Sequence, residues 1–222
     1  SNRWLERHLN DEYVIKSKID GYRSRSSYKL IQINKKFNFF KRSNNILDLG
    51  CSPGGWLQVS QKLAPKNSKI LGVDKIHLEF IPDVKFIQND IFDDDVFEKI
   101  DTFFEGKKID LILSDMSPNS SGNKKVDHLR IISLIEKVLD LSEYFLSKNG
   151  FLIAKIFQGG AQGDLIKKMK KTLSSIKYFK PKASRSESPE TYLECCLNFQ
   201  FEFEETLLLA LSASRQEGLL LD

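Results

Sequence analysis

This chain contains few of the residues that hold metal ions or form disulfide frameworks. It has three cysteines and three histidines, and no C-x-x-C pair occurs. Two cysteines are adjacent, so in a strand their side chains point to opposite faces, and the histidines lack metal-ligand spacing. These residues are Cys51, Cys195, Cys196, His8, His77 and His128. The sequence therefore predicts no metal site and no disulfide framework, and it indicates a reducing compartment.

Long apolar runs, repeats and a P-loop are also absent from the sequence. No apolar stretch approaches the roughly 20 residues that cross a bilayer, so no membrane partner is expected. The G-x-x-x-x-G-K-[ST] pattern does not occur. The chain begins at Ser1 without a methionine. If a targeting peptide has been trimmed, a mitochondrial or other organellar matrix is expected, and otherwise the cytoplasm or nucleus.

The net charge is small, but the charged residues are clustered. The chain has 34 Lys+Arg against 30 Asp+Glu, a formal net charge of +4 over 222 residues. Basic residues gather in 16–42 and 167–185, whereas acidic residues gather in 90–105 and in the C-terminal tail. This asymmetry predicts a basic face for an anionic partner, although solvated helix faces would produce the same clusters. The length suits one domain with a sizeable core.

Short apolar strands alternate with amphipathic helices along most of the chain. This alternation predicts an α/β fold with a mostly parallel sheet covered by helices on both faces. The expected strands are 45–49, 69–73, 84–88, 109–113, 151–157, 176–179 and 192–199. The expected helices are 3–18, 25–38, 56–63, 93–104, 127–147 and 162–174, with Gly150 ending the fifth. The tail, residues 201–222, is expected to form either a terminal helix or a disordered segment.

Glycines and carboxylates follow the first three strands. The turn at 50–55 (GCSPGG) opens a helix and lets a ligand approach the backbone. Because it departs from G-x-G-x-x-G, it does not favour a dinucleotide. Asp74 ends the second strand, where a carboxylate suits the ribose hydroxyls of an adenosine group. Asp90 follows the third strand, where it is placed to accept from an adenine amino group. Each carboxylate alone would also suit a helix cap or a solvated loop.

Lys155 lies in an otherwise apolar run, 151–157, that predicts a buried strand. Burying an unpaired ammonium is unfavourable, and it forces the group to find a partner or lose its proton. A salt bridge with Asp115 at the end of the neighbouring strand would be a purely structural explanation. A role in proton transfer would be a functional one.

Five motifs then carry a resemblance to a known family. They are YRSRSSYKL from Tyr22, DLGCSPGGW from Asp48, SDMSPN from Ser114, KIFQG from Lys155 and ASRSESPETY from Ala183. Together they resemble the FtsJ/RrmJ family of S-adenosylmethionine-dependent RNA 2′-O-methyltransferases, over nearly all of the chain except the tail. The resemblance implies a Rossmann-like class I methyltransferase fold with a seven-stranded, mostly parallel sheet.

The resemblance also assigns roles to individual residues. It implies a catalytic tetrad of Lys29, Asp115, Lys155 and Glu190. It implies S-adenosylmethionine as cofactor, S-adenosylhomocysteine as product, and no required metal. The turn, the strand ends and the resemblance together predict the cofactor-binding residues Gly50, Pro53, Gly54, Gly55, Trp56, Asp74, Asp90 and Asp115. Ordinary helix-to-sheet packing remains an alternative for Trp56.

Methyl transfer to a ribose hydroxyl is an in-line displacement from a sulfonium. The poor partner is the hydroxyl, whose proton must leave as the new bond forms. Alignment of the reacting atoms should supply much of the rate, and a general base adds roughly 10²–10⁴-fold. Lys155 is the candidate base: burial and the second ammonium of Lys29 favour its neutral form, whereas Asp115 and Glu190 oppose this and hold it in place. The four groups are expected to titrate as a coupled set.

The basic segments acquire a purpose in this interpretation. Residues 1–42 are expected to form a helical, basic, RNA-facing extension of the domain, and residues 43–200 the catalytic part. Phosphate contacts are expected from Arg23, Arg25, Lys35, Lys36, Lys182 and Arg185.

The substrate is less closely defined by the sequence. The N-terminal segment and 183–192 look most like the bacterial and organellar branch, which methylates a uridine ribose in large-subunit ribosomal RNA. The expected partner is therefore ribosomal RNA or the large ribosomal subunit, and the family suggests a monomer. A tRNA or mRNA-cap ribose methyltransferase is the alternative enzyme, and an inactive ribosome-assembly factor is the alternative without catalysis.

Overall fold

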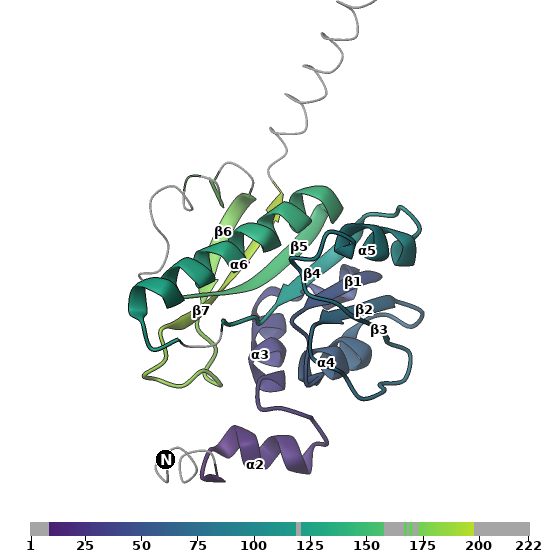
Figure 1. Ribbon diagram of the computed structural model, residues 1–222. Helices are drawn as coiled ribbons and strands as arrows, with labels where there is room; N and C mark the ends of the chain where they lie inside the picture. Colours follow the sequence, from purple (N-terminus) through teal and green to yellow (C-terminus); the bar gives the residue numbers. More distant parts are fainter. Residues whose placement is uncertain (1–8, 119–120, 158–166, 168, 171–172, 198–222) are drawn as a thin grey trace, which may run out of the picture.

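One sheet of seven strands organises the protein (Figure 1). The computed structural model describes residues 9–118, 121–157, 167, 169–170 and 173–197. The strand order is β3-β2-β1-β4-β5-β7-β6. The strands are β1 (Asn45–Leu49), β2 (Lys69–Asp74), β3 (Lys85–Gln88), β4 (Ile109–Ser114), β5 (Leu146–Phe157), β6 (Leu173–Phe179) and β7 (Glu190–Leu197).

Most of the sheet is parallel, and its last hairpin is not. β1 pairs in parallel with β2 and β4, and the same direction continues to β3 and β5. β7 runs antiparallel to both β5 and β6. The chain order reverses between β1 and β4, the switch point at which open α/β sheets bind ligands beyond the carboxyl ends of their strands. This arrangement confirms the expected α/β fold.

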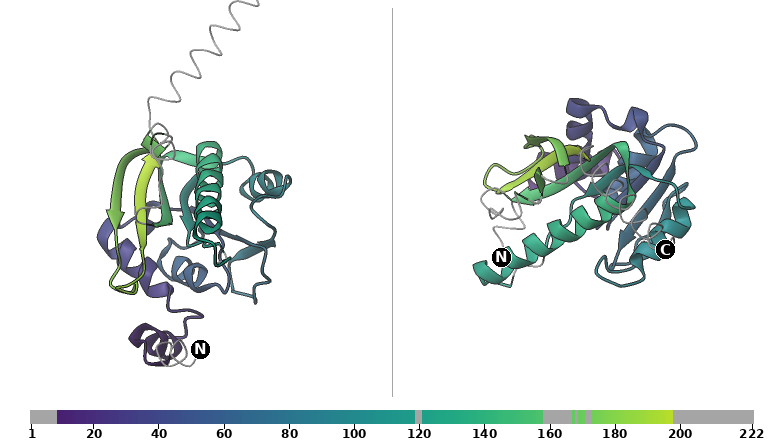
Figure 2. Two further views of the ribbon diagram at one scale, coloured as in Figure 1. Left: turned by 60° about the vertical axis from the view of Figure 1, so that its left-hand side comes forward. Right: turned by 90° about the horizontal axis from the view of Figure 1, so that it is seen from above.

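Helices cover both faces of the sheet (Figure 2). Helices α3 and α4 pack on one face, and α5 and α6 on the other. Helix α2 lies apart from the sheet and connects to α3 (Figure 1). The helices are α2 (Glu12–Ile19), α3 (Ser27–Phe37), α4 (Gly55–Leu63), α5 (Val96–Phe104) and α6 (Lys124–Phe145), with a 3-10 turn, η1, at Phe40–Arg42. No helix in the described ranges is long and apolar enough to cross a membrane.

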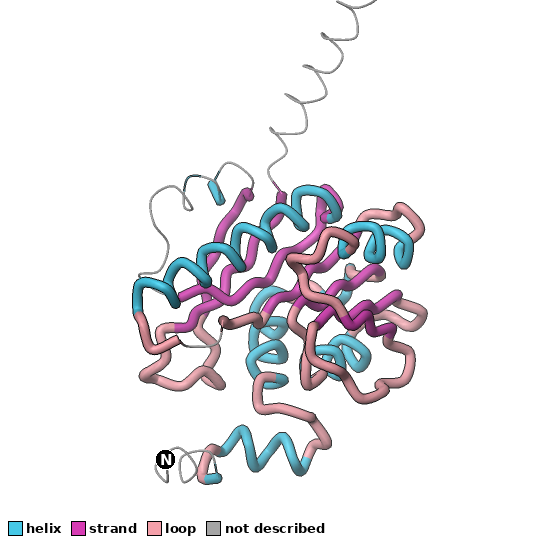
Figure 3. The backbone as a smooth tube through the Cα atoms, viewed as in Figure 1, coloured by secondary structure: helices cyan, strands magenta, loops and turns pink. Residues whose placement is uncertain are grey.

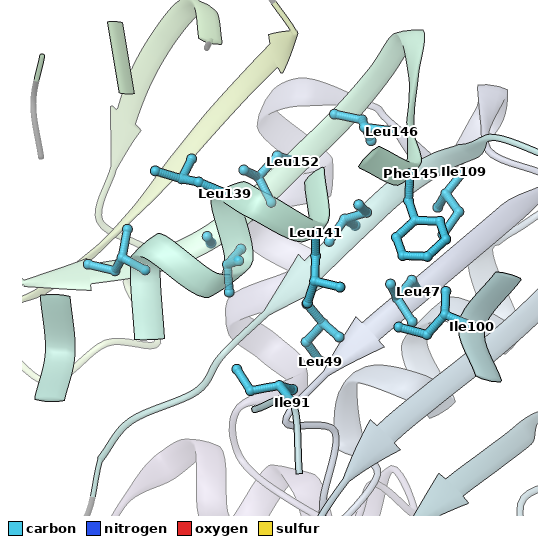
Figure 4. Packing of buried hydrophobic residues seen from close by; sticks show 14 of the residues in the cluster. Leu47, Leu49, Ile91, Ile100, Ile109, Leu139, Leu141, Phe145, Leu146 and Leu152 are labelled. Carbon is cyan, nitrogen blue, oxygen red and sulfur yellow. The ribbon is translucent and has the colours of Figure 1, made fainter. Parts of the chain in front are cut away.

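Strand alternation divides the core into two apolar clusters. Leu47, Leu49 and Leu152 face α5 and α6 (Figure 4), whereas Ile46 and Ile153 face α3 and α4. Because side chains alternate along a strand, Lys155 shares the α3–α4 face with Ile153. Lys155 therefore lies on the face that α3 and α4 cover, near the end of β5.

The expected elements agree with the structure except at a few boundaries. Gly150 does not end α6; the helix ends at Phe145, and β5 runs through Gly150. Pairing with β4 explains the difference, because Leu146 is already opposite Ile109. A Cβ at Gly150 would lie 3.0 Å from the Ile109 carbonyl, so glycine permits this close passage.

Two further expectations fall partly outside the described ranges. The helix expected over 162–174 lies mostly there, and its last two residues instead begin β6, because Leu173 and Ser174 pair with β7. The first expected helix, 3–18, is wrong as one continuous helix, because the described part breaks at Asn10 and α2 begins only at Glu12, with Asp11 as its N-cap, and runs to Ile19. The tail, 201–222, lies outside the described residues.

Candidate active site at the carboxyl edge of the sheet

Lys155 has its partner at the neighbouring strand end. Its Nζ lies 3.1 Å from Asp115 Oδ1, and it donates a 2.6 Å hydrogen bond to the Asp115 carbonyl. The Lys155 side chain is 7% exposed and that of Asp115 is 20% exposed. The anomalous lysine is thus paired with the carboxylate that strand order predicted.

A second ion pair joins two distant parts of the chain. Lys29, in the first turns of α3, lies 2.6 Å from Glu190, the first residue of β7. Both side chains are almost enclosed, at 9% and 12% exposed. Glu190 is in register with Phe157, two residues beyond Lys155. The four residues of the expected tetrad therefore lie as two ion pairs at the same end of the α3-facing side of the sheet.

Tyr192 links the two ion pairs. It is opposite Lys155 in the β5–β7 register, and its hydroxyl donates a 2.6 Å hydrogen bond to Asp115 Oδ1. The Lys29 ammonium lies 5.8 Å from the centre of its ring. The sequence motif that ends at Tyr192 served only to identify Glu190, and it assigned no role to Tyr192 itself. Its place between the pairs depends on antiparallel register, which a motif does not display.

The electrostatics of this cluster stabilise an ionised Asp115 and a neutral Tyr192. Burial by itself raises the pKa of Asp115, but the ammoniums of Lys155 and Lys29 and the Tyr192 hydroxyl outweigh it, so the pKa lies below its usual value. Burial, followed by the nearby charges of Asp115 and Glu190, raises the pKa of Tyr192 well above its usual value. Tyr192 is therefore a hydrogen-bond donor at neutral pH.

A cavity of about 570 Å³ opens beside the cluster and shares Asp115 with it. Four of the residues expected to bind the cofactor line it: Gly50, Asp74, Asp90 and Asp115. Its other lining residues come from the strand ends and from α6. They are Ser52, Val73, Lys75, Ile76, Asn89, Ile91, Phe92, Met116, Ser117, Pro118, Arg130, Ser133 and Leu134. Most of these residues lie at or just after the end of a predicted strand, and this position is the sequence signal that could have identified them. The residues from α6 carry no such signal in the sequence.

Hydrogen bonds from the backbone fix the loops that follow β1 and β2; loops are pink in Figure 3. The two carboxylate oxygens of Asp74 accept from the N–H groups of Ser52 and Ile76, both at 2.8 Å. Gly50 has a φ of 71°, and a Cβ there would lie 2.1 Å from Met116 Cγ. Glycine at this turn therefore allows Met116 to lie against the backbone between β1 and the cavity.

Four of the residues expected at the cofactor, Pro53, Gly54, Gly55 and Trp56, lie beside the cavity and are not among its lining residues. Gly55 lies against the hydroxyls of Ser24 and Ser27, which leave no room for a Cβ. Trp56 is 3% exposed, and its ring NH donates a 2.9 Å hydrogen bond to the Ser26 carbonyl. Its packing role is plain from this geometry. Contacts of Pro53, Gly54, Gly55 and Trp56 with a cofactor remain predictions.

Asp48 is a buried carboxyl beneath the same turn. It is 1% exposed, and its Oδ2 has no hydrogen-bond partner within the described part of the chain. Burial, with additions from Asp115 and Asp74, raises the pKa of Asp48 well above its usual value. Asp48 thus favours its neutral form, in contrast to Asp115 close by.

The six residues expected to bind RNA divide into two groups. Three arginines already contact protein groups: Arg23 donates to three carbonyls, Arg25 pairs with Asp11 at 3.0 Å, and the Arg185 Nε lies 3.6 Å from the same carboxylate. The other three are exposed lysines. They are Lys35, Lys36 and Lys182.

The described part of the chain shows neither a cluster of metal ligands nor a disulfide. Within the described ranges, no three His, Cys, Asp or Glu side chains gather as a metal site would require. The three cysteines are free.

Comparisons with known proteins identify relatives over most of the chain. A family model for FtsJ-like methyltransferases matches residues 22–198. The ribosomal RNA large subunit methyltransferase E of Rickettsia conorii is 43% identical over 198 residues, which cover 87% of each chain. Its counterpart in Wolbachia of Brugia malayi is 47% identical over 193 residues, again 87% of each chain. A crystal structure of a Plasmodium falciparum ribosomal RNA methyltransferase aligns with a TM-score of 0.70 at 36% identity, over 79% of this chain and 98% of that one.

Proposed function

We propose that this chain, which belongs to the FtsJ-like methyltransferase family, transfers a methyl group from S-adenosylmethionine to a ribose 2′-hydroxyl of large-subunit ribosomal RNA. One observation carries the proposal: two ion pairs, Lys155–Asp115 and Lys29–Glu190, meet beside a cavity that Asp115 also lines. The names of the bacterial relatives support ribosomal RNA as the substrate, and a uridine ribose is the expected target.

The cavity has the donor and acceptor groups that the cofactor requires. Asp74 would bind the ribose hydroxyls of the adenosine group, and Asp90 would accept from the adenine amino group. Asp115 lines the cavity and also contacts Lys155, so the methionine end of the cofactor would face the tetrad. When bound, S-adenosylmethionine supplies an electrophilic methyl group on a good leaving group.

The tetrad residues align the acceptor hydroxyl and remove its proton. Lys155, held by two contacts to Asp115, is the group that would take the proton at its Nζ. Lys29 adds a second positive charge near Asp115, and Glu190 fixes Lys29 in place. Precise positioning of the hydroxyl should contribute at least as much as the base.

RNA would approach this edge of the sheet over a basic surface. Lys35, Lys36 and Lys182 are exposed and available for phosphates, and Arg23, Arg25 and Arg185 would add to them with their remaining N–H groups. Residues 1–42 would thus extend the catalytic domain toward the RNA. Such binding should weaken steeply with added salt, and a flat salt response would contradict it.

One experiment separates this proposal from its alternatives. Radiolabelled methyl transfer should be measured with large ribosomal subunits, naked large-subunit rRNA, tRNA and capped RNA, and the modified ribose mapped. We expect labelling of rRNA or of the subunit at one ribose 2′-oxygen. Labelling of tRNA or capped RNA alone would refute the substrate. No labelling of any RNA by a protein that binds S-adenosylmethionine would indicate an inactive assembly factor.

A further inference from the structure

Phe80 is an aromatic side chain held in solvent by an otherwise well-packed loop. It is 81% exposed, whereas Leu78 and Ile81 on either side are 6% and 5% exposed. The loop joins β2 to β3 and lies beside α4 (Figure 3). Exposing a phenylalanine forgoes the free energy of its burial, which a partner that covers the ring would recover.

The loop is fixed to the turn that borders the candidate active site. Arg23 donates to the carbonyls of Glu79, Phe80 and Pro53 at 2.7, 2.9 and 3.3 Å. A Cβ at Gly54 would lie 2.9 Å from Ile81 and 3.0 Å from Leu78. The loop therefore packs directly on the glycine turn, and Phe80 is presented at the carboxyl edge of the sheet in a set orientation.

Basic and aromatic residues alternate beside this loop. The Lys62 ammonium lies 4.1 Å from the ring centre of Tyr22, the residue before Arg23. Tyr22 packs on Tyr28 at 5.7 Å between ring centres, and Lys16 lies over Tyr28 at 5.0 Å. Surfaces that bind single-stranded nucleic acid combine positive charge with aromatic rings in this way.

We propose that Phe80 is a stacking platform for an unpaired RNA base next to the target nucleotide. This inference rests on the proposed function, which supplies an RNA substrate at this edge. RNA is read mainly where its bases are unpaired and can stack on aromatic side chains. Glu79, next to Phe80, and Asp83 are exposed acidic residues of the same loop, so what Phe80 itself offers a nucleotide is a ring for its base and not a cation for its phosphate. Arg23 acts here as the clamp that fixes the platform.

Salt dependence distinguishes stacking from phosphate binding. Phe80→Ala should weaken binding of in vitro transcribed large-subunit rRNA about tenfold, equivalent to about 1.4 kcal/mol, without changing the slope of log affinity against log salt. Phe80→Trp should bind as tightly as the original protein, and Phe80→Leu should bind as weakly as Phe80→Ala.

Lys182→Ala, which removes a phosphate contact, should instead reduce the slope of log affinity against log salt by about 0.7. Arg23→Ala should weaken binding, and adding it to Phe80→Ala should weaken binding by less than the product of the two effects.

Tyr144→Ala is the matched control. Tyr144 is 55% exposed at the end of α6, and its carbonyl accepts from Lys108, which precedes β4 at the opposite edge of the sheet. It should bind RNA normally, and thermal midpoints should show that every variant is folded.

Several outcomes would overturn the stacking proposal. These are unchanged RNA affinity of Phe80→Ala, full affinity of Phe80→Leu, or a reduced salt slope for either variant. A defect seen with assembled large subunits and not with naked rRNA would instead identify Phe80 as a protein contact. Because these results need only an original protein that binds RNA, they are distinct from failure of the proposed function, in which that protein neither binds nor methylates any RNA.

Discussion

The hydroxyl of Tyr192 donates a hydrogen bond to Asp115 Oδ1 at 2.6 Å, and Lys155 lies 3.1 Å from the same oxygen. One carboxylate oxygen thus holds both the base candidate and a neutral donor. Because Tyr192 is enclosed by the sheet and by Trp56, 5.8 Å away between ring centres, Asp115 has little freedom to turn away from Lys155.

Tyr192→Phe tests this shared oxygen. Loss of the donor should raise the pKa of Asp115 toward its usual value, while the ion pair with Lys155 persists. We expect methyl transfer to fall by about tenfold, in line with about 1.5 kcal/mol for a hydrogen bond to a charged group. The acidic limb of the kcat profile should move to higher pH. Unchanged activity at every pH would show that the hydroxyl is not needed to position Asp115.

Lys155→Met tests the proton-transfer role. The kcat of the variant should fall by about 10²- to 10⁴-fold. Its affinity for S-adenosylmethionine, measured by calorimetry, should change little. Lys155→Arg should also fail, because a guanidinium does not deprotonate usefully. Lys41→Met, at an exposed lysine of η1, is the matched control. Normal methylation by Lys155→Met would refute the assignment.

The Lys29–Glu190 pair allows stability and catalysis to be separated. Glu190→Gln leaves the enclosed Lys29 ammonium without its carboxylate, which should cost about 3 kcal/mol and lower the thermal midpoint by roughly 6–12 °C. The double variant Lys29→Met with Glu190→Met should recover part of this stability, because no unpaired charge remains, yet stay inactive.

The exposed Lys69–Glu105 pair is the control for that experiment. Its atoms are 2.7 Å apart, but the side chains are 37% and 62% exposed. Glu105→Gln should therefore change the thermal midpoint little. If the double variant of Lys29 and Glu190 is active, the Lys29–Glu190 pair has a structural role alone.

Asp48 predicts a pH dependence of stability. Its folded pKa is raised by burial, so the folded state binds this proton more tightly than the unfolded chain. The free energy of unfolding should therefore fall as the pH rises from about 4, the usual aspartate value, toward the folded pKa. Asp48→Asn removes this titration. In urea unfolding from about pH 4 to pH 8, its stability relative to the original protein should increase with pH.

A control variant tests that interpretation of Asp48. Asp94→Asn removes a carboxyl from an exposed loop, and its stability relative to the original protein should change less with pH than that of Asp48→Asn, because its side chain is not buried. A pH-independent difference for Asp48→Asn would contradict a raised pKa in the folded state.

The course of the chain through strands and helices was predictable because it depends on local patterns. Apolar strands such as 45–49 and 109–113, and the amphipathic pattern over 25–38, were found nearly at their structural bounds. The boundary at Gly150 was not, because the pairing of Leu146 with β4 prevails over a local helix signal.

Local sequence patterns therefore sufficed to locate the strand ends, and hence the edge of the sheet that holds Asp74, Asp90 and Asp115. Two relationships could be found only in the folded molecule: Tyr192 lies opposite Lys155, and Arg23 binds the loop of Phe80. The physical reason is the range of the interactions. Periodicity records whether a residue faces the core, whereas register, antiparallel pairing and loop contacts arise between segments far apart in the chain and leave no local pattern.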